Sequence, residues 1–198
     1  GPGEMELLIE ASKLSGQPLS VLLIQYNDFP DRWRETLSHI INANEMGINT
    51  TGQVGSRPIG VLMGFNTSVN PFSSHEAWQK IKDLNTFERN KLIRENSDIR
   101  EKLINEVPVN GHTKWIENTF LLSYILEEPL NYEPTKEMSI SYLAKSNNIS
   151  PWEIMLNHFI SSDKDEFIMH TFENYTHNNL DVISEMLESK YTICGVGD

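Results

Sequence analysis

The chain is poor in cysteine and in basic residues, and it has no long apolar run. Only one of its 198 residues is a cysteine, Cys194, so no internal disulfide can form. This cysteine lies inside an apolar stretch, which predicts a buried, reduced thiol and a reducing, cytoplasmic location. No hydrophobic stretch approaches the roughly 20 residues that cross a bilayer, so we expect no membrane-spanning segment.

The charge balance excludes one broad class of partner. The chain has 16 Lys and Arg residues against 28 Asp and Glu residues, a formal net charge of −12. Because binding to phosphate backbones needs clustered basic side chains, we expect no nucleic-acid partner. Hydrophobic residues make up 38% of the chain and no low-complexity tract is present, which is typical of a globular protein with a real core.

The usual sequence signatures of metal and phosphate sites are also missing. The six histidines form neither an HxH pair nor an HExxH motif. They are His39, His75, His112, His158, His170 and His177. We expect His39 and His158 to lie inside helices, and His170 to be a hydrogen-bonded residue of the core. The glycine-rich stretches "GQVGSRPIG" and "GVGD" do not match a phosphate-binding loop.

Helical and extended patterns alternate along the chain. Apolar spacing and end signals predict helices over 4–14, 31–46, 151–160 and 178–189. Short apolar or β-branched runs predict strands within 19–24, 48–65, 165–172 and 191–197. Between residues 70 and 148 the pattern is one of helices and turns, with no convincing strand. This alternation with short connections is typical of an α/β fold with a parallel sheet.

The chain divides into four segments on these patterns. Residues 1–3 resemble the scar of a cleaved expression tag. We expect βα units over 4–69, a mainly helical insertion over 70–148, and final βα units over 149–198.

Candidate functional residues follow the expected strands. In parallel α/β folds the chemistry gathers where the carboxyl ends of the strands meet. Gln25, Arg57, Asn174 and Asp198 occupy such positions. Each also has a structural interpretation: Asp198 as a turn former, for example, and Arg57 as part of an Arg-Pro turn.

Several stretches, in order along the chain, resemble the N-acyl-D-amino-acid deacylases of the amidohydrolase superfamily. The first two are "GQVGSRPIGVLMGFNTSVNPFSSHEAWQKI" and "LNTFERNKLIRENSDIREKLINE". The later ones are "SISYLAKSNNISPWEIMLNHFI" and "FENYTHNNLDVISEMLESKYTICGVGD". Together they cover nearly all of the chain after the scar.

The resemblance implies a fold and a reaction. The chain would be the later part of a (β/α)8 barrel with a helical insertion, and the reaction would be zinc-dependent hydrolysis of an N-acyl-D-amino acid. Asp198 matches the acid at the end of the last barrel strand, and would act as a metal ligand and proton relay. Arg57 would anchor the substrate carboxylate, because a guanidinium pairs with it bidentately. Asn174 and Gln25 would contact the substrate.

The sequence departs from the family at its metal ligands. The family's HxH pair has no counterpart, and the strand ending at Gln25 lacks the expected histidine. Two alternatives therefore stay open: a non-catalytic homologue, and a small α/β binding or interaction module. A partial barrel would leave sheet edges and apolar surface uncovered, so we expect the chain to self-associate.

Overall fold

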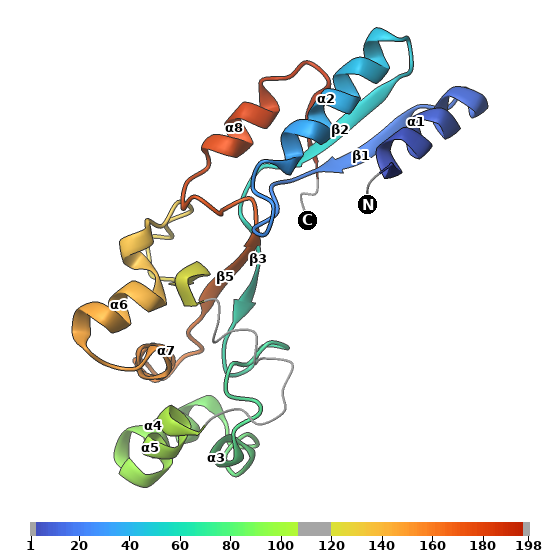
Figure 1. Cartoon of the computed structure of the whole chain (residues 1–198). Helices are drawn as coiled ribbons and strands as arrows, with labels where there is room; N and C mark the ends of the chain where they lie inside the picture. The colour runs from blue at the N-terminus through green and yellow to red at the C-terminus, as the bar shows by residue number, and fades with distance from the viewer. Residues whose placement is uncertain (1–2, 107–119, 196–198) are drawn as a thin grey trace. The chain divides into compact units, whose positions relative to one another are not determined.

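The structure is a computed structural model that describes residues 3–106 and 120–195 (Figure 1). Contacts divide the chain into two compact units. Unit 1 combines residues 1–59 with 172–198, and unit 2 comprises residues 60–171. Asp198, the expected metal ligand and proton relay, and His112 lie outside the described residues. No helix of the described part is long and apolar enough to cross a membrane.

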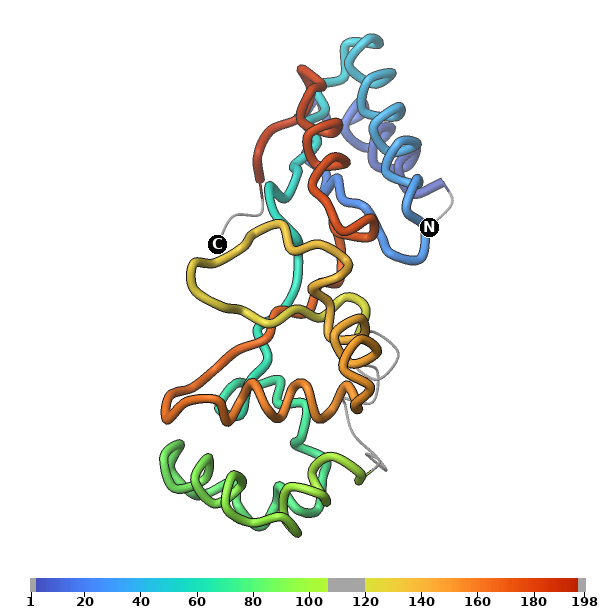
Figure 2. The backbone as a smooth tube through the Cα atoms, turned by 90° about the vertical axis from the view of Figure 1, so that its left-hand side faces the viewer, coloured from blue at the N-terminus to red at the C-terminus, as the bar shows by residue number. Residues whose placement is uncertain are grey.

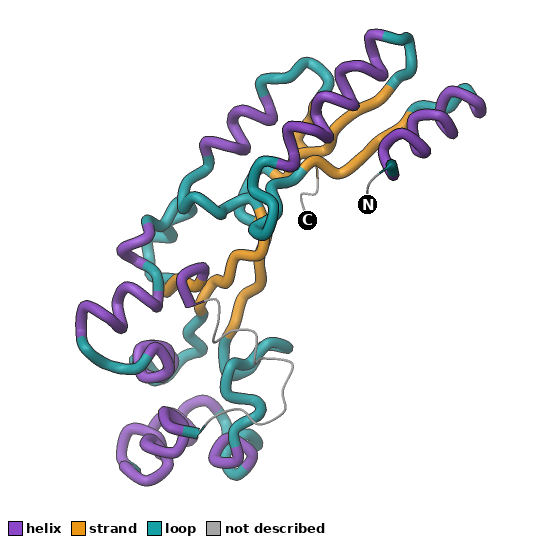
Figure 3. The backbone as a smooth tube through the Cα atoms, in the orientation of Figure 1, coloured by secondary structure: helices purple, strands orange, loops and turns teal. Residues whose placement is uncertain are grey.

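Unit 1 contains a parallel three-stranded sheet in the order β1-β2-β6. Strands are drawn in orange in Figure 3. Its strands are β1 (Leu19–Leu23), β2 (Thr50–Gly55) and β6 (Thr192–Gly195). Its helices are α1 (Glu4–Ser15), α2 (Arg32–Glu45) and α8 (Asp181–Leu187). The predicted α/β class with parallel strands is therefore confirmed. The described strands form open sheets and do not close into a barrel.

The core of unit 1 lies between this sheet and helices α2 and α8. Trp33 and Ile40 of α2 are buried with Leu23 and Val54 of the sheet. A Cβ atom on Gly52 would lie 3.0 Å from Ile40 Cδ1. Glycine at this position of β2 therefore lets the helix approach the strand closely.

The apolar side chains of α1 include exposed ones, since Leu7 and Leu14 are 75% and 79% exposed. The burial prediction for Cys194 is wrong. Cys194 is also exposed, because its strand β6 does not lie in the interior of the unit. The predicted end of α1 is confirmed: Gly16 has the left-handed conformation, with φ 68°, that suits glycine.

Unit 2 combines a second sheet with most of the helices. Strands β3 (Ile59–Met63), β5 (Ile168–Glu173) and β4 (Ser123–Ile125) form the sheet in the order β3-β5-β4. The helices are α3 (Glu76–Gln79), α4 (Thr86–Glu95), α5 (Ser97–Asn105), α6 (Ile140–Asn147) and α7 (Pro151–Phe159). Two 3₁₀ turns, η2 (Phe120–Leu122) and η3 (Lys136–Met138), complete it.

The strands differ from the sequence prediction in three ways. Strand β5 was expected in the parallel sheet, but it pairs antiparallel with β4. Residues 48–65 were expected to hold one strand and contain two, β2 and β3. The stretch over 70–148 was expected to lack strands and contains β4. Partners far apart in the chain determine all three, so the local pattern does not show them.

An aromatic core holds the helices of unit 2 together. Helix α7 packs against both α5 and α6 (Figure 2). Phe65 stacks on Trp78 with ring centroids 4.8 Å apart, and Phe159 meets Phe65 edge-on at 5.0 Å. The start of α7 is as predicted, because the Ser150 side chain accepts a hydrogen bond from the Trp152 N–H.

Candidate functional site

The register of the parallel sheet brings three strand ends to one edge. Leu23 of β1 lies opposite Val54 of β2, which lies opposite Cys194 of β6. Gln25 follows β1 by two residues and Arg57 follows β2 by two residues. This edge is where ligand sites occur in open α/β sheets. Asp198, the predicted catalytic acid, follows β6 in the sequence but lies outside the described residues.

Asn174 joins the ends of β1 and β2. Its backbone is left-handed, with φ 62°, and its side chain is fully buried. Its Oδ1 accepts a hydrogen bond from the Gln25 N–H at 2.7 Å, and its own N–H donates to the Gln25 carbonyl at 3.0 Å. Its Nδ2 donates to the Gly55 carbonyl at 3.1 Å. A Cβ on Gly55 would lie 3.3 Å from Nδ2, so glycine leaves room for this bond.

The side chain of Gln25 is also occupied by loop contacts. It is 1% exposed, its Nε2 donates to the Pro30 carbonyl at 3.3 Å, and its Oε1 accepts from the Thr176 N–H at 3.3 Å. These bonds satisfy polar groups that would be costly to bury alone. Gln25 and Asn174 therefore fix the loops after β1 and β5, and their role as substrate contacts stays a prediction.

A second set of contacts adds an acid that the sequence analysis missed, Glu173. Thr176 Oγ1 donates to Asn27 Oδ1 at 2.7 Å, and the Asn27 N–H donates to Glu173 Oε2 at 3.1 Å. Burial raises the pKa of Glu173, the negative charge of Asp28 raises it further, and the Asn27 N–H opposes the shift. The signal available in the sequence was an acidic residue at a strand end, directly before Asn174.

Arg57 is the exposed cation that follows β2. It lies between exposed Ser56 and buried Pro58. The buried proline fixes the backbone next to it, because its ring restricts φ. An exposed guanidinium on a fixed turn is suited to pairing with the carboxylate of a ligand.

The described residues do not fit a zinc ion. None of the His, Cys, Asp and Glu residues within 3–106 and 120–195 form a group of three that could hold a metal. Gln25 lies just after β1, where a histidine ligand was expected, and its side-chain oxygen accepts a hydrogen bond from the Thr176 N–H.

His170 is a core residue of unit 2, as predicted. It is 1% exposed, bonds Ser123 Oγ through Nδ1 at 2.8 Å, and burial lowers its pKa to about 4.

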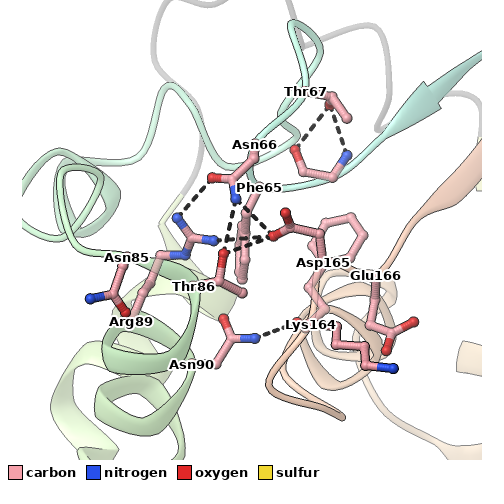
Figure 4. A network of polar contacts seen from close by, with 12 residues as sticks. Phe65, Asn66, Thr67, Asn85, Thr86, Arg89, Asn90, Lys164, Asp165 and Glu166 are labelled. Atoms are coloured by element: carbon pink, nitrogen blue, oxygen red, sulfur yellow. Dashed lines mark hydrogen bonds and ion pairs between the residues drawn. The ribbon is translucent and has the colours of Figure 1, made fainter.

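Unit 2 contains a separate polar network around Arg89 of α4 (Figure 4). The guanidinium lies 4.9 Å from the Phe65 ring centroid, and its Nη1 donates to Asn66 Oδ1 at 3.0 Å. Its Nη2 lies 3.8 Å from Asp165 Oδ1, which accepts hydrogen bonds from Asn66 and Thr86. Burial lowers the pKa of Arg89, and Asp165 opposes that shift. The network joins α4 to the segment before β5, so its role is structural.

No family model matches the chain, and no curated protein or solved structure is significantly similar to it.

Proposed function

We propose that the chain forms part of the active face of an amidohydrolase that cleaves N-acyl-D-amino acids. The observation that supports this proposal most strongly is the register of β1, β2 and β6, which gathers their carboxyl ends at one edge. Polar residues follow these ends as they do in (β/α)8 enzymes. The resemblance of the sequence to the deacylases supplies the reaction class.

In this proposal the described residues bind and orient the substrate. Arg57 pairs with the α-carboxylate of the N-acyl amino acid through two parallel hydrogen bonds. Asn174 and Gln25 hold the neighbouring loops in a fixed arrangement, so that the edge is preorganised before the substrate arrives. Asp198 is the predicted proton acceptor. Glu173, whose pKa is raised, is a second carboxyl group suited to proton transfer at this edge.

The rest of the barrel would have to come from outside the described strands. A (β/α)8 barrel needs eight parallel strands, whereas unit 1 has three. The zinc ligands would come from those further strands, because the described residues do not supply them.

One observation favours the alternative of a binding module without hydrolysis. The amide groups of Gln25 and Asn174 are already engaged, and the described edge has no metal-binding group. Such an edge can hold a carboxylate ligand through Arg57 without activating water.

The test is hydrolysis of N-acetyl-D- and N-acetyl-L-amino acids by the natural protein that contains this chain, with bound zinc counted. We expect cleavage of the D-substrates. Arg57→Gln should raise KM about tenfold with little change in kcat, because it removes ground-state binding of the carboxylate. Asp198→Ala should abolish turnover.

Lys190→Gln is the matched control. Lys190 precedes β6, so it lies at the amino edge of the same sheet, and the change removes the same charge. Equal effects of Lys190→Gln and Arg57→Gln would count against the proposed edge. Binding of N-acetyl amino acids that depends on Arg57, without cleavage or zinc, would establish the binding module instead.

A further inference from the structure

Strand β1 forms one edge of the unit 1 sheet, and its outer side is open. In the order β1-β2-β6, β1 pairs only with β2. The Leu19 N–H donates to the carbonyl just before β2 at 2.8 Å, so the backbone groups of Leu19, Val21 and Leu23 face β2. Those of Ser20 and Leu22 face outward. No described residue forms a hydrogen bond with the backbone N–H or C=O groups of these two residues.

The opposite edge of the same sheet, formed by β6, is partly closed. The Gly52 N–H donates to the Tyr191 carbonyl at 3.0 Å, so the backbone groups of Thr192 and Cys194 face away from β2. The Thr192 N–H already donates to the Ser189 carbonyl at 3.1 Å. Short edge strands are one means by which proteins prevent unwanted strand pairing, and β6 has only four residues. The longer β1 is therefore the edge that is free to accept another strand.

The sequence of β1 also lacks the residues that protect an exposed edge. Charged side chains, proline and bulges are the usual protection. No charged residue occurs from Leu14 to Asn27, although the formal net charge of the chain is −12. Strand β1 contains neither proline nor glycine, and its pairing with β2 is uninterrupted. A second copy of the chain can therefore approach this edge without placing like charges opposite each other.

From these observations we infer that β1 pairs antiparallel with β1 of a second copy of the chain, about a two-fold axis beside Val21. This register pairs all five residues of the strand and places Ser20 of each copy opposite Leu22 of the other. The outward backbone groups of both copies are then satisfied. Leu22 is 47% exposed, and the two Leu22 side chains become diagonal neighbours on one face, within reach of each other.

The inferred pairing forms a closed dimer and goes beyond the proposed reaction. Each copy has a single β1 edge, so a two-fold pair uses both edges and adds no third copy. Five paired residues make an interface smaller than the standard size of about 1,600 Å², so we expect a weak dimer with a Kd above about 1 µM. A further barrel strand in a longer protein would occupy the same edge. The test therefore uses the chain of 198 residues, and its result does not depend on hydrolysis.

Sedimentation equilibrium measures the dimer directly. Between about 5 and about 500 µM the average mass should rise from 22.7 kDa toward twice this value. Leu22→Lys should raise the Kd of the dimer at least about tenfold, because two like charges become neighbours. Ile193→Lys is the matched control and should leave the Kd unchanged. Ile193 lies in the same row of the sheet as Leu22, through Gln53, but on β6, and it is 53% exposed.

A disulfide tests the register. In a Cys194→Ser background, Val21→Cys places two thiols in a non-hydrogen-bonded pair with Cα atoms about 4.5 Å apart, which a disulfide can span. Mild oxidation should link Val21→Cys into a covalent dimer and leave Ile193→Cys monomeric. Thermal melts establish that each variant is folded. A mass of 22.7 kDa at every concentration, masses above the dimer, or equal results for the β1 and β6 variants in either assay would overturn the inference.

Discussion

Replacing Asn174 tests whether one side chain holds the carboxyl edge of unit 1 together. In Asn174→Ala the Gln25 N–H and the Gly55 carbonyl both lose their side-chain partner. Both groups lie in buried backbone at the ends of β1 and β2. The alanine must also adopt the left-handed conformation of Asn174, φ 62°.

The size of the effect follows mainly from the two lost hydrogen bonds. Leaving a buried donor or acceptor unsatisfied costs about 1–3 kcal/mol. Asn174 already has a Cβ at positive φ, so alanine adds only a part of the roughly 1–2 kcal/mol cost of the left-handed conformation, the part from which asparagine is relieved by local hydrogen bonding. Part of each cost is relieved by water and local adjustment. We therefore expect Asn174→Ala to lower the free energy of unfolding by about 3–5 kcal/mol, and Asn174→Gly by about 1 kcal/mol less, because glycine tolerates the positive φ.

The assay is urea unfolding followed by circular dichroism, with hydrogen exchange to assign the change to unit 1. Asn148→Ala is the control, because Asn148 is exposed and also has a positive φ, 54°. It should cost only about 1 kcal/mol, from the backbone alone. If Asn174→Ala costs no more than Asn148→Ala, the hydrogen bonds to Gln25 and Gly55 contribute no stability and the reasoning is refuted.

Two further predictions concern ionisable groups of unit 2. Burial lowers the pKa of His170 to about 4, below its value near 6.5 in the unfolded chain. The neutral ring therefore contributes its full share to the free energy of unfolding above pH 6.5. This contribution, about 3 kcal/mol, is lost as the pH falls to about 4. Thermal melts across this pH range should show that stability depends less steeply on pH in His170→Gln than in the unsubstituted chain. The control His177→Gln, at an exposed position, should leave this dependence unchanged. An unchanged dependence in His170→Gln would contradict the buried neutral ring. Asp165→Asn leaves the Arg89 cation uncompensated and should cost about 1–2 kcal/mol, whereas adding Arg89→Met should recover about 1 kcal/mol. Strictly additive costs in this double-mutant cycle would show that the two groups do not interact.

The sequence predicted the elements whose signals are local. Helix α7 begins at Pro151, the start predicted from the sequence, because the serine cap Ser150 and the proline both act within the first turn. The apolar spacing and end signals over 31–46 also predict helix α2, and its Trp33 and Ile40 are buried. Such signals depend on neighbours within four residues, so they can be read without the fold.

The features that were missed depend on distant partners. Whether β5 pairs with β4 or with a parallel strand is decided by backbone contacts such as Ser123 opposite His170, and the apolar pattern of β5 fits either. The exposure of Cys194 likewise depends on what covers its strand. At the candidate site the position of Asn174 after a strand was visible, but its hydrogen bond to Gln25, 149 residues away, was not.

Unit 1 is formed by two stretches of the chain that are separated by unit 2, and this has a consequence for biosynthesis. A ribosome releases β1 and β2 first, then all of unit 2, and only after that β6, the second neighbour of β2. Unit 2 is one uninterrupted stretch and can fold as it emerges. During that time one edge of β2 has no strand beside it and is open to other nascent chains. Strand β6 can thus pair with β2 only after unit 2 has emerged, and a chain terminated before Thr192 would lack this partner of β2.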